Sequence, residues 1–230
     1  MPADLLLLHG FTQTGASWAG VRQALGGRYR SLAPDLGAGP WEAELDRLEA
    51  LAPPAYVLAG YSMGGRLALA LALRRPERVR ALVLVSASPG LAGGDERAAR
   101  RRADEALADR IEAVGVEVFA REWAAQPLFA GQPPAVAALA HEDRMRRSAA
   151  EHAAQLRGLG TGVMPPLWDR LGELALPVTL VVGERDAKFT AIAERMAERL
   201  PEATLVVVQG AGHAVALEAP AAVATQLALP

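Results

Sequence analysis

Six short apolar runs recur along the chain, and each has the length of a β-strand. Their residues are apolar on both faces of a strand, which is typical of the buried strands of a parallel sheet. Patterns with helical periodicity, ended by Gly or Pro, lie between most of the runs. This alternation predicts an α/β fold with a mainly parallel, doubly wound sheet of about six strands. The runs span 4–10, 29–35, 55–61, 81–87, 178–184 and 203–210, and the clearest helical patterns span 17–27, 41–51, 64–76 and 190–201.

The alternation stops between Ser88 and Leu174, where the sequence is rich in Ala and Arg and has helical periodicity. A long helical insertion between two strands is most simply a cap over the carboxyl ends of the strands, where open α/β sheets bind ligands. The alternative is a helical segment that packs away from that edge. We therefore expect a core of residues 1–88 and 175–230 and a helical cap of residues 89–174.

Length and composition narrow the class of protein. A chain of 230 residues that is 51% hydrophobic can bury one sizeable core, as a single α/β domain with an insertion does. Its 24 basic and 26 acidic residues give no field that would steer it to nucleic acid or an anionic membrane. The lack of cysteine excludes disulfides and thiolate catalysis. The first ten residues have no basic segment and too short an apolar run for a signal peptide or a membrane span, so we expect a soluble, cytoplasmic protein.

Metal and nucleotide sites find little support in the sequence. No group of His, Asp and Glu residues has the spacing of metal ligands. The run GYSMGG at 60–65 lacks the lysine of a phosphate-binding loop. We expect no cofactor, no nucleic-acid or membrane partner, and a small molecule as the ligand. Monomer and homodimer both stay open.

Ser62 lies in the pentapeptide GYSMG, which matches the G-x-S-x-G nucleophile elbow. Small flanking residues permit the strained turn that holds the serine hydroxyl above the end of a sheet. The pentapeptide follows a predicted strand and opens a predicted helix, which is the context that an elbow requires. A chance serine in a glycine-rich turn is the alternative, and the context weakens it.

A catalytic serine needs a histidine to take its proton and an acid to fix the tautomer of that histidine. His213 lies in a glycine-rich loop after the last predicted strand, at the edge of the sheet where Ser62 is expected. Asp186 in GERDAKF follows the fifth strand and is the candidate acid, with Glu184 as its competitor. The chain order Ser, Asp, His is that of α/β-hydrolases. The remaining candidates are expected in other roles: His9 in shaping a loop, Asp35 in the structure, and His141 and His152 on the surface of the cap.

The segment HGFTQTGASW at 9–18 supplies the third element. A His-Gly turn after the first strand can aim a backbone N–H at the space over Ser62, and the residue after the serine supplies a second N–H. These donors are Phe11 and Met63, although an ordinary tight turn would also explain the glycines. Together with the elbow, the histidine and the acid, they predict an α/β-hydrolase fold.

Arg66 lies four residues after Ser62 and therefore on the same face of the predicted helix, one turn further on. Its guanidinium could bind a substrate carboxylate with two hydrogen bonds. A structural ion pair is an equally open interpretation, because buried arginines are usually paired.

Several segments together resemble the 2-succinyl-6-hydroxy-2,4-cyclohexadiene-1-carboxylate synthases of menaquinone biosynthesis. They are HGFTQTGASW, GYSMGGRLAL, WAAQPLF at 123–129, LRGLGTGVMPPLW at 156–168, GERDAKF and GAGHAVALEAP. The resemblance covers nearly the whole chain. It departs from the pattern DLPGHG of many relatives at 35–40, where this chain has DLGAGP.

The resemblance implies a lyase that removes a proton next to a succinyl ketone and releases pyruvate by 2,5-elimination. Ser62, His213 and Asp186 would then be the base, and the oxyanion hole would stabilise an enolate. Three arginines would bind the carboxylates of the substrate, and three aromatic residues would border the pocket, unless these simply belong to the core. The arginines are Arg66, Arg100 and Arg144, and the aromatic residues are Tyr61, Trp123 and Phe129.

Two other functions stay open. A serine hydrolase of a small carboxylated ester, lactone or carbon–carbon bond substrate would use the same three catalytic residues and would require water. A ligand receptor would retain them without catalysis, but no apolar helix or tail indicates a partner surface.

Overall fold

The computed structural model describes residues 4–228, and its centre is a six-stranded sheet in the order β2-β1-β3-β4-β5-β6. Every pair of neighbouring strands is parallel. The predicted α/β fold class is therefore confirmed. The strands are β1 (Asp4–Leu8), β2 (Arg30–Leu32), β3 (Tyr56–Tyr61), β4 (Val79–Val85), β5 (Val178–Gly183) and β6 (Ala203–Val208).

The strands differ in burial according to their place in the sheet. Every residue of β3 is buried, and β1, β4 and β5 are buried along most of their lengths. The two edge strands β2 and β6 are half-buried or exposed throughout, so the expectation of six buried strands is wrong for these two. Each edge strand has only one neighbouring strand, and fewer side chains cover it. Only three residues of the predicted run 29–35 are in strand β2.

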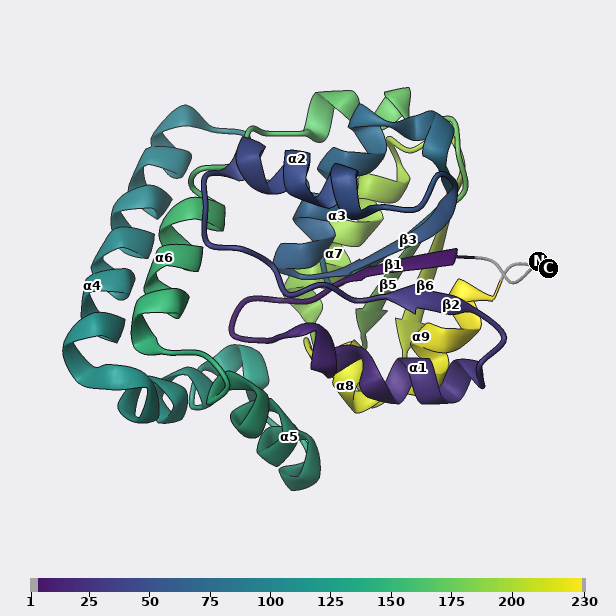
Figure 1. The fold of residues 1–230 in the computed structure, drawn as a ribbon. Helices are drawn as coiled ribbons and strands as arrows, with labels where there is room; N and C mark the ends of the chain where they lie inside the picture. The colour runs from purple at the N-terminus through teal and green to yellow at the C-terminus, as the bar shows by residue number, and fades with distance from the viewer. Residues whose placement is uncertain (1–3, 229–230) are drawn as a thin grey trace.

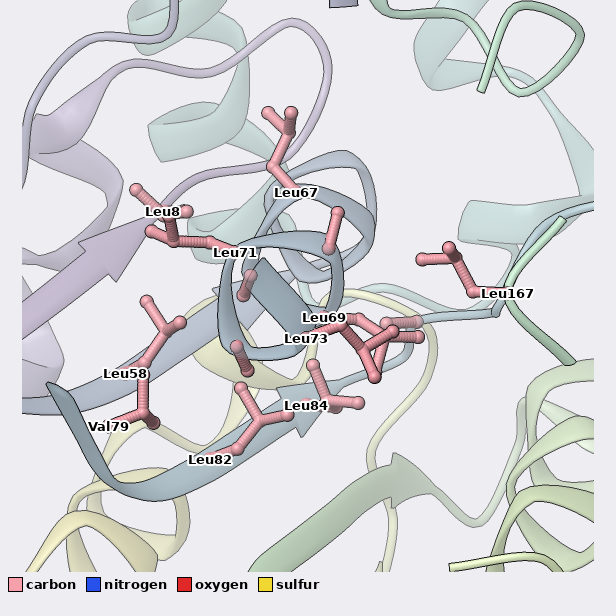
Figure 2. Close-up of a cluster of buried hydrophobic side chains, with 14 of the residues drawn as sticks. Leu8, Leu58, Leu67, Leu69, Leu71, Leu73, Val79, Leu82, Leu84 and Leu167 are labelled. Carbon is pink, nitrogen blue, oxygen red and sulfur yellow. The ribbon is translucent and has the colours of Figure 1, made fainter. Parts of the chain in front are cut away.

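Helices cover both faces of the sheet (Figure 1). One apolar cluster joins α2, α3 and α7 to one face, and a second joins α1, α8 and α9 to the other face. Figure 2 shows leucines of α3 packed against leucines of β1, β3 and β4 on one face of the sheet, and every residue of this helix except Arg74 is buried. The bounds are α1 (Ala19–Leu25), α2 (Trp41–Leu51), α3 (Met63–Arg74), α7 (Ala187–Ala197), α8 (Val215–Glu218) and α9 (Pro220–Leu227).

The chain from α4 to α6 is helical and lies beyond the carboxyl ends of the strands (Figure 1). Here α4 packs along α6, and Gly115 bends α4 with φ of 78° and ψ of 166°. The stretch that follows α6 packs into the first apolar cluster through Leu167, Leu171 and Leu174. No helix within residues 4–228 is long and apolar enough to cross a membrane. The segment contains α4 (Gly94–Ala124), α5 (Pro134–Arg144) and α6 (Ala149–Leu159), with short 3-10 helices at Pro127–Phe129 and Trp168–Glu173.

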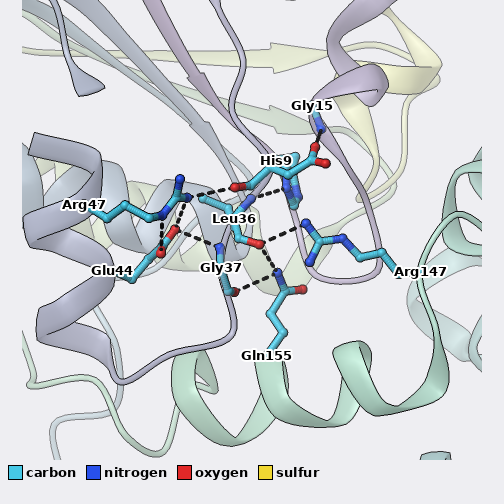
Figure 3. Close-up of polar contacts among 9 residues, drawn as sticks. His9, Gly15, Leu36, Gly37, Glu44, Arg47, Arg147 and Gln155 are labelled. Atoms are coloured by element: carbon cyan, nitrogen blue, oxygen red, sulfur yellow. Dashed lines mark hydrogen bonds and ion pairs between the residues drawn. The ribbon is translucent and has the colours of Figure 1, made fainter. Parts of the chain in front are cut away.

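The loop at 35–40 joins the sheet to this helical segment (Figure 3). The N–H of Leu36 donates to His9 Nε2 at 2.8 Å. The carbonyl oxygen of Leu36 accepts from Arg147 at 2.9 Å and from Gln155 of α6 at 3.2 Å. Glu44 of α2 holds the next residue by accepting from its N–H at 2.9 Å. The sequence DLGAGP therefore forms a fixed contact between β1, α2 and α6.

Candidate active site

The turn between β3 and α3 holds Ser62 in a strained backbone conformation, with φ of 50° and ψ of −108°. The neighbouring glycines are required by close contacts. A Cβ atom on Gly60 would lie 2.3 Å from the carbonyl oxygen of Gly64, and one on Gly64 would lie 2.2 Å from that of Leu8. The local backbone is thus the strand-to-helix elbow that the pentapeptide predicts, at the carboxyl end of a central strand.

Ser62, His213 and Asp186 lie in hydrogen-bond contact. His213 Nδ1 is 2.6 Å from Asp186 Oδ2, and His213 Nε2 is 3.3 Å from Ser62 Oγ. A carboxylate only accepts, so Nδ1 carries the proton and Nε2 is free to accept from the serine hydroxyl. The imidazole and the carboxylate are both buried. This arrangement can remove a proton from Ser62 and stabilise the imidazolium that forms.

The competing acid Glu184 lies apart from His213. Its carboxylate is exposed and accepts from the N–H of Gly210 at 2.9 Å. Asp186 instead caps the N-terminus of α7, where its Oδ1 accepts from the N–H of Phe189 at 3.3 Å. Of the two carboxylates, only that of Asp186 is oriented toward the histidine.

Two backbone N–H groups beside Ser62 lack an acceptor. Within residues 4–228, neither the N–H of Phe11 nor that of Met63 donates to a protein atom. The loop that carries Phe11 packs against the elbow, because a Cβ atom on Gly10 would lie 2.5 Å from the ring of Tyr61. His9 lies at the start of this loop, and its Nδ1 is 2.8 Å from the carbonyl oxygen of Gly10. Burial lowers the pKa of His9 to about 4, so its imidazole is neutral. Free N–H groups in this position can stabilise a developing oxyanion.

A cavity of about 450 Å³ opens over Ser62 and His213. Its floor comes from the sheet edge and α3, and its walls come from α4, α6 and the first turn of α7. Trp123 lines one wall and contacts Phe11 edge to face, with ring centroids 5.2 Å apart. This volume suits a small molecule.

Arg66 enters the cavity from α3 and is 7% exposed. The only hydrogen bond of its side chain to the described residues is a 3.6 Å contact with the sulfur of Met164. None of the described acids lies within ion-pair distance, so the structural ion-pair interpretation is wrong for this residue. Burial and the charge of Arg100 lower the pKa of Arg66 to about 10. A buried, unpaired guanidinium in a cavity is a site for an anion.

Arg100 lines the same cavity from α4, but it is already paired. Its Nε donates to Asp104 Oδ1 at 2.7 Å, and the arginine side chain is 43% exposed. The neighbouring Arg101 instead reaches the carbonyl oxygen of Gly162. Arg100 is therefore the member of the arginine run 100–102 that faces the cavity.

Arg144 lies outside this cavity. It lines a second, smaller cavity of about 20 Å³ together with Tyr61, Phe129 and one side of Phe11. Its Nη1 donates to the carbonyl oxygen of Ala120 at 3.2 Å, and its Nε has no partner within the described residues. Burial lowers the pKa of Arg144 to about 10. Phe11 stands between the two cavities, so Arg144 and Arg66 do not face one common space.

Sequence reasoning missed several lining residues and misplaced one histidine. Lys188 and Phe189 line the main cavity from the first turn of α7, directly after Asp186, and Phe189 packs on His213 with ring centroids 4.5 Å apart. His152, expected on the surface, is fully buried, and its ring lies against Phe11. The position of His152 on the apolar face of α6 was the sequence feature that indicated its burial. Gln126, Ser88 and Asp104 also line the main cavity.

Comparisons with known proteins point to one family. The model of the alpha/beta hydrolase family matches residues 5–226. The chain is 36% identical, over 94% of its length and 85% of the relative, to a Bacillus subtilis protein provisionally named 2-succinyl-6-hydroxy-2,4-cyclohexadiene-1-carboxylate synthase. It is 32% identical, over 98% of its length and 92% of the relative, to a Salmonella typhimurium protein of that name. The solved structure of MenH from S. aureus matches with a TM-score of 0.93 and 28% identity, covering 98% of this chain and 92% of that one.

Proposed function

The chain belongs to the alpha/beta hydrolase family and, within it, to the 2-succinyl-6-hydroxy-2,4-cyclohexadiene-1-carboxylate synthases, and we propose that it catalyses the reaction of these enzymes. The substrate is 2-succinyl-5-enolpyruvyl-6-hydroxy-3-cyclohexene-1-carboxylate. A proton leaves the carbon next to the succinyl ketone, and pyruvate departs by 2,5-elimination. The enzyme is thus a carbon–oxygen lyase of menaquinone biosynthesis. Its cytoplasmic location stays a prediction.

The proposed base is Ser62 acting with His213 and Asp186. His213 Nε2 takes the hydroxyl proton, and the serine oxygen takes the proton from the substrate carbon. The contacts of 3.3 Å and 2.6 Å along this chain of groups support the transfer. Asp186 keeps the histidine in the tautomer that accepts from serine and stabilises the imidazolium.

The charge that the proton leaves behind goes to the succinyl ketone oxygen as an enolate. The free N–H groups of Phe11 and Met63 are the proposed donors to this oxygen. They are backbone groups of a packed loop and of a helix N-terminus, so they need no rearrangement when the charge develops. A water-derived nucleophile has no part in this reaction, which separates it from hydrolysis.

Arg66 carries the assignment of a carboxylated substrate. Its buried guanidinium faces the cavity without an acidic partner among the described residues, one turn along α3 from Ser62. A substrate carboxylate in this position would form a charge-assisted, two-point contact. The same contact would fix the distance between the ring of the substrate and the catalytic serine.

The remaining binding residues have different roles in the proposal. Arg100 binds a second carboxylate from α4, in exchange for part of its contact with Asp104. Trp123 borders the main cavity directly. Arg144, Tyr61 and Phe129 line the smaller cavity behind Phe11, where they support the oxyanion loop. Of the three, Arg144 alone adds positive charge, and it does so through the wall rather than by contact with the substrate.

The test is a direct assay of the purified protein with the enolpyruvyl substrate. Pyruvate release and diene absorbance report the elimination. Ser62→Ala should lower kcat about a thousandfold, because proton transfer loses its base. Arg66→Met should lower kcat/KM about a hundredfold by loss of the carboxylate contact, while the methionine keeps the space filled. Arg121→Met, an exposed charge on α4 outside the cavity, is the matched control and should change neither constant.

Serine hydrolysis is the second candidate function, because the same three residues can activate serine as a nucleophile. A protein that releases no pyruvate but cleaves small esters or lactones, with Arg66→Met unimpaired, would be a hydrolase. Activity on neither class of substrate would favour the ligand receptor.

A further inference from the structure

Lys188 is the only lysine in the chain, and its side chain lines the main cavity. It lies on the first turn of α7, two residues after Asp186. The side chain is exposed, and its ammonium has no hydrogen bond or ion pair to residues 4–228. Its ammonium lies 5.7 Å from the centroid of the Phe189 ring, and that ring packs on His213. A free cation therefore stands on the histidine side of the cavity.

The cations around the cavity come from three different elements. Arg66 comes from α3, Arg100 from α4 and Lys188 from α7. Arg66 is buried, whereas Lys188 is exposed and the Arg100 side chain is 43% exposed, so the cavity is closed at Arg66 and open toward Lys188 and Arg100. Arg100 shares its charge with Asp104. Arg144 faces the other cavity, which leaves Lys188 as the third cation that a substrate in the main cavity can reach.

We infer that Lys188 binds the carboxylate of the enolpyruvyl group and of the pyruvate that departs, an assignment that rests on the proposed function. A leaving group must exit through the open end of the cavity, where Arg100 is already paired with Asp104 and Lys188 has no acidic partner among the described residues. The ring-side carboxylates then lie toward Arg66 and Arg100. Lysine suits this position, because a flexible point charge can follow a departing group, whereas a bidentate guanidinium holds it.

The chemistry of the step balances without a further reactant. The carbon–hydrogen bond next to the ketone gives its proton to Ser62, and its electron pair forms the enolate. Collapse of the enolate along the ring breaks the bond from ring carbon to the enolpyruvyl oxygen. The electron pair of that bond stays on the oxygen as the enolate of pyruvate. Its carbon takes up one proton, which matches the proton that His213 gives up when the neutral imidazole is restored. Lys188 offsets the negative charge that increases on this group as the bond breaks.

Product inhibition separates the two ends of the cavity. The inhibition constants of pyruvate and of the cyclohexadiene product are measured for the wild type, Lys188→Met, Lys188→Arg and Arg66→Met. Lys188→Met should raise the constant for pyruvate roughly tenfold and leave that for the diene unchanged, whereas Arg66→Met should do the reverse. Lys188→Arg should restore most of the pyruvate affinity. Arg121→Met again controls for the loss of one surface charge.

Two results would overturn the assignment. A rise confined to the diene constant in Lys188→Met would assign the lysine to a ring-side carboxylate, and two unchanged constants would remove it from the binding site. A wild type without lyase activity is a different result, because it refutes the proposed function before any variant is compared.

The single lysine also permits a binding measurement by NMR that does not depend on enzyme inhibition. Reductive methylation with ¹³C-formaldehyde labels Lys188 and the terminal amine only, so the side chain gives one resolved NMR signal. Saturable movement of this signal with pyruvate, and a smaller movement with acetate, is the expected result. An unmoved signal, or equal movement with acetate, would contradict a pyruvate site at Lys188.

Discussion

The carboxyl edge of the sheet and the helical segment above it contribute to one cavity by different means. At the sheet edge, backbone conformation sets the positions: Ser62 has a positive φ, and Gly64 touches the backbone of β1. In the helical segment, long side chains set the positions. Arg100 reaches the cavity beside its partner Asp104, and the ring of Trp123 packs on Phe11 at the cavity wall.

This difference indicates which region can accept amino-acid substitutions without loss of the fold. A side chain added at the sheet edge would contact backbone atoms, and these cannot shift unless the neighbouring strand or turn shifts with them. A charge exchanged in the helical segment leaves the sheet and the elbow as they are. The proposed catalytic residues therefore lie in the more constrained region, together with Arg66 and Lys188, whereas the more adaptable helical segment contributes Arg100 and Trp123 to the cavity.

Two glycine substitutions should expose the contrast most strongly. In Gly64→Ala the added Cβ would lie 2.2 to 2.5 Å from three backbone atoms of Leu8 and His9. We therefore expect the free energy of unfolding to fall by about 4 kcal/mol and nearly all activity to be lost.

In Gly115→Ala nothing lies within 4 Å of the added Cβ, but the positive φ is strained for alanine. We therefore expect the free energy of unfolding to fall by about 2 kcal/mol. Denaturant unfolding and the pyruvate assay measure both.

The activity of the folded fraction decides whether the contrast holds. Gly115→Ala should keep near-normal kcat, because Gly115 lies in α4 outside the main cavity. Equal losses of stability and kcat in the two variants would mean that the helical segment is as tightly coupled to the chemistry as the elbow is.

Two of the three buried histidines, His9 and His152, provide a test by pH. Burial lowers the pKa of His9 at the sheet edge from 6.5 to about 4, and burial also lowers the pKa of His152 in α6. The unfolded chain therefore binds these protons first as the pH falls, and stability is lost from about pH 6.5 downward. For His9 the loss is complete near pH 4 and is about 3 kcal/mol. Arg147 adds to the lowering, while Asp35 and Asp143 oppose it.

Comparison with His9→Gln isolates this contribution. Glutamine can accept from the N–H of Leu36 but does not titrate, so the difference in unfolding free energy between wild type and variant should shrink as the pH falls from 6.5 to 4. A constant difference over this range would show that His9 is not the group that takes up the proton. His152→Gln, in α6 of the helical segment, should also change how the free energy of unfolding depends on pH.

The sheet edge could be predicted from the sequence in more detail than the helical segment. The fold class and the family were predicted and are confirmed. Ser62, Asp186 and His213 were recognisable because each follows a strand, and parallel strands end at a common edge. Local glycines mark these turns, since positive φ and close backbone contacts restrict the residue type.

The helical segment resisted prediction because side-chain direction there depends on packing. Arg100, Arg101 and Arg102 are adjacent in sequence, and only the contact of α4 with α6 decides which of them faces the cavity. Lys188 gave no signal, because an exposed lysine on a first helical turn is ordinary. His152 was misplaced because its polarity outweighed its position on the apolar face of α6, where Leu156 follows one turn later.

The contact between the two regions gives the smallest predicted effect. Asp143, at the end of α5, is buried and accepts from the N–H of Thr14 at 2.8 Å and from its hydroxyl at 2.5 Å. This pair joins the residue beside Arg144 to the loop that carries Phe11. Asp143→Asn keeps the shape but replaces one acceptor by a donor, so we expect a loss of about 1 to 2 kcal/mol in unfolding free energy.

The effect of Asp143→Asn on kcat decides what the contact does. If it positions the oxyanion loop, kcat should fall several-fold with little change in KM, because the Phe11 N–H acts on the enolate and not on the bound substrate. Thr14→Val, which removes the hydroxyl on the other side of the contact, should have the same signature. The matched control is Asp109→Asn, an exposed acid of α4 paired with Arg157, and it should change neither stability nor rate. A loss of stability without a fall in kcat would make Asp143 a purely structural link between the two regions.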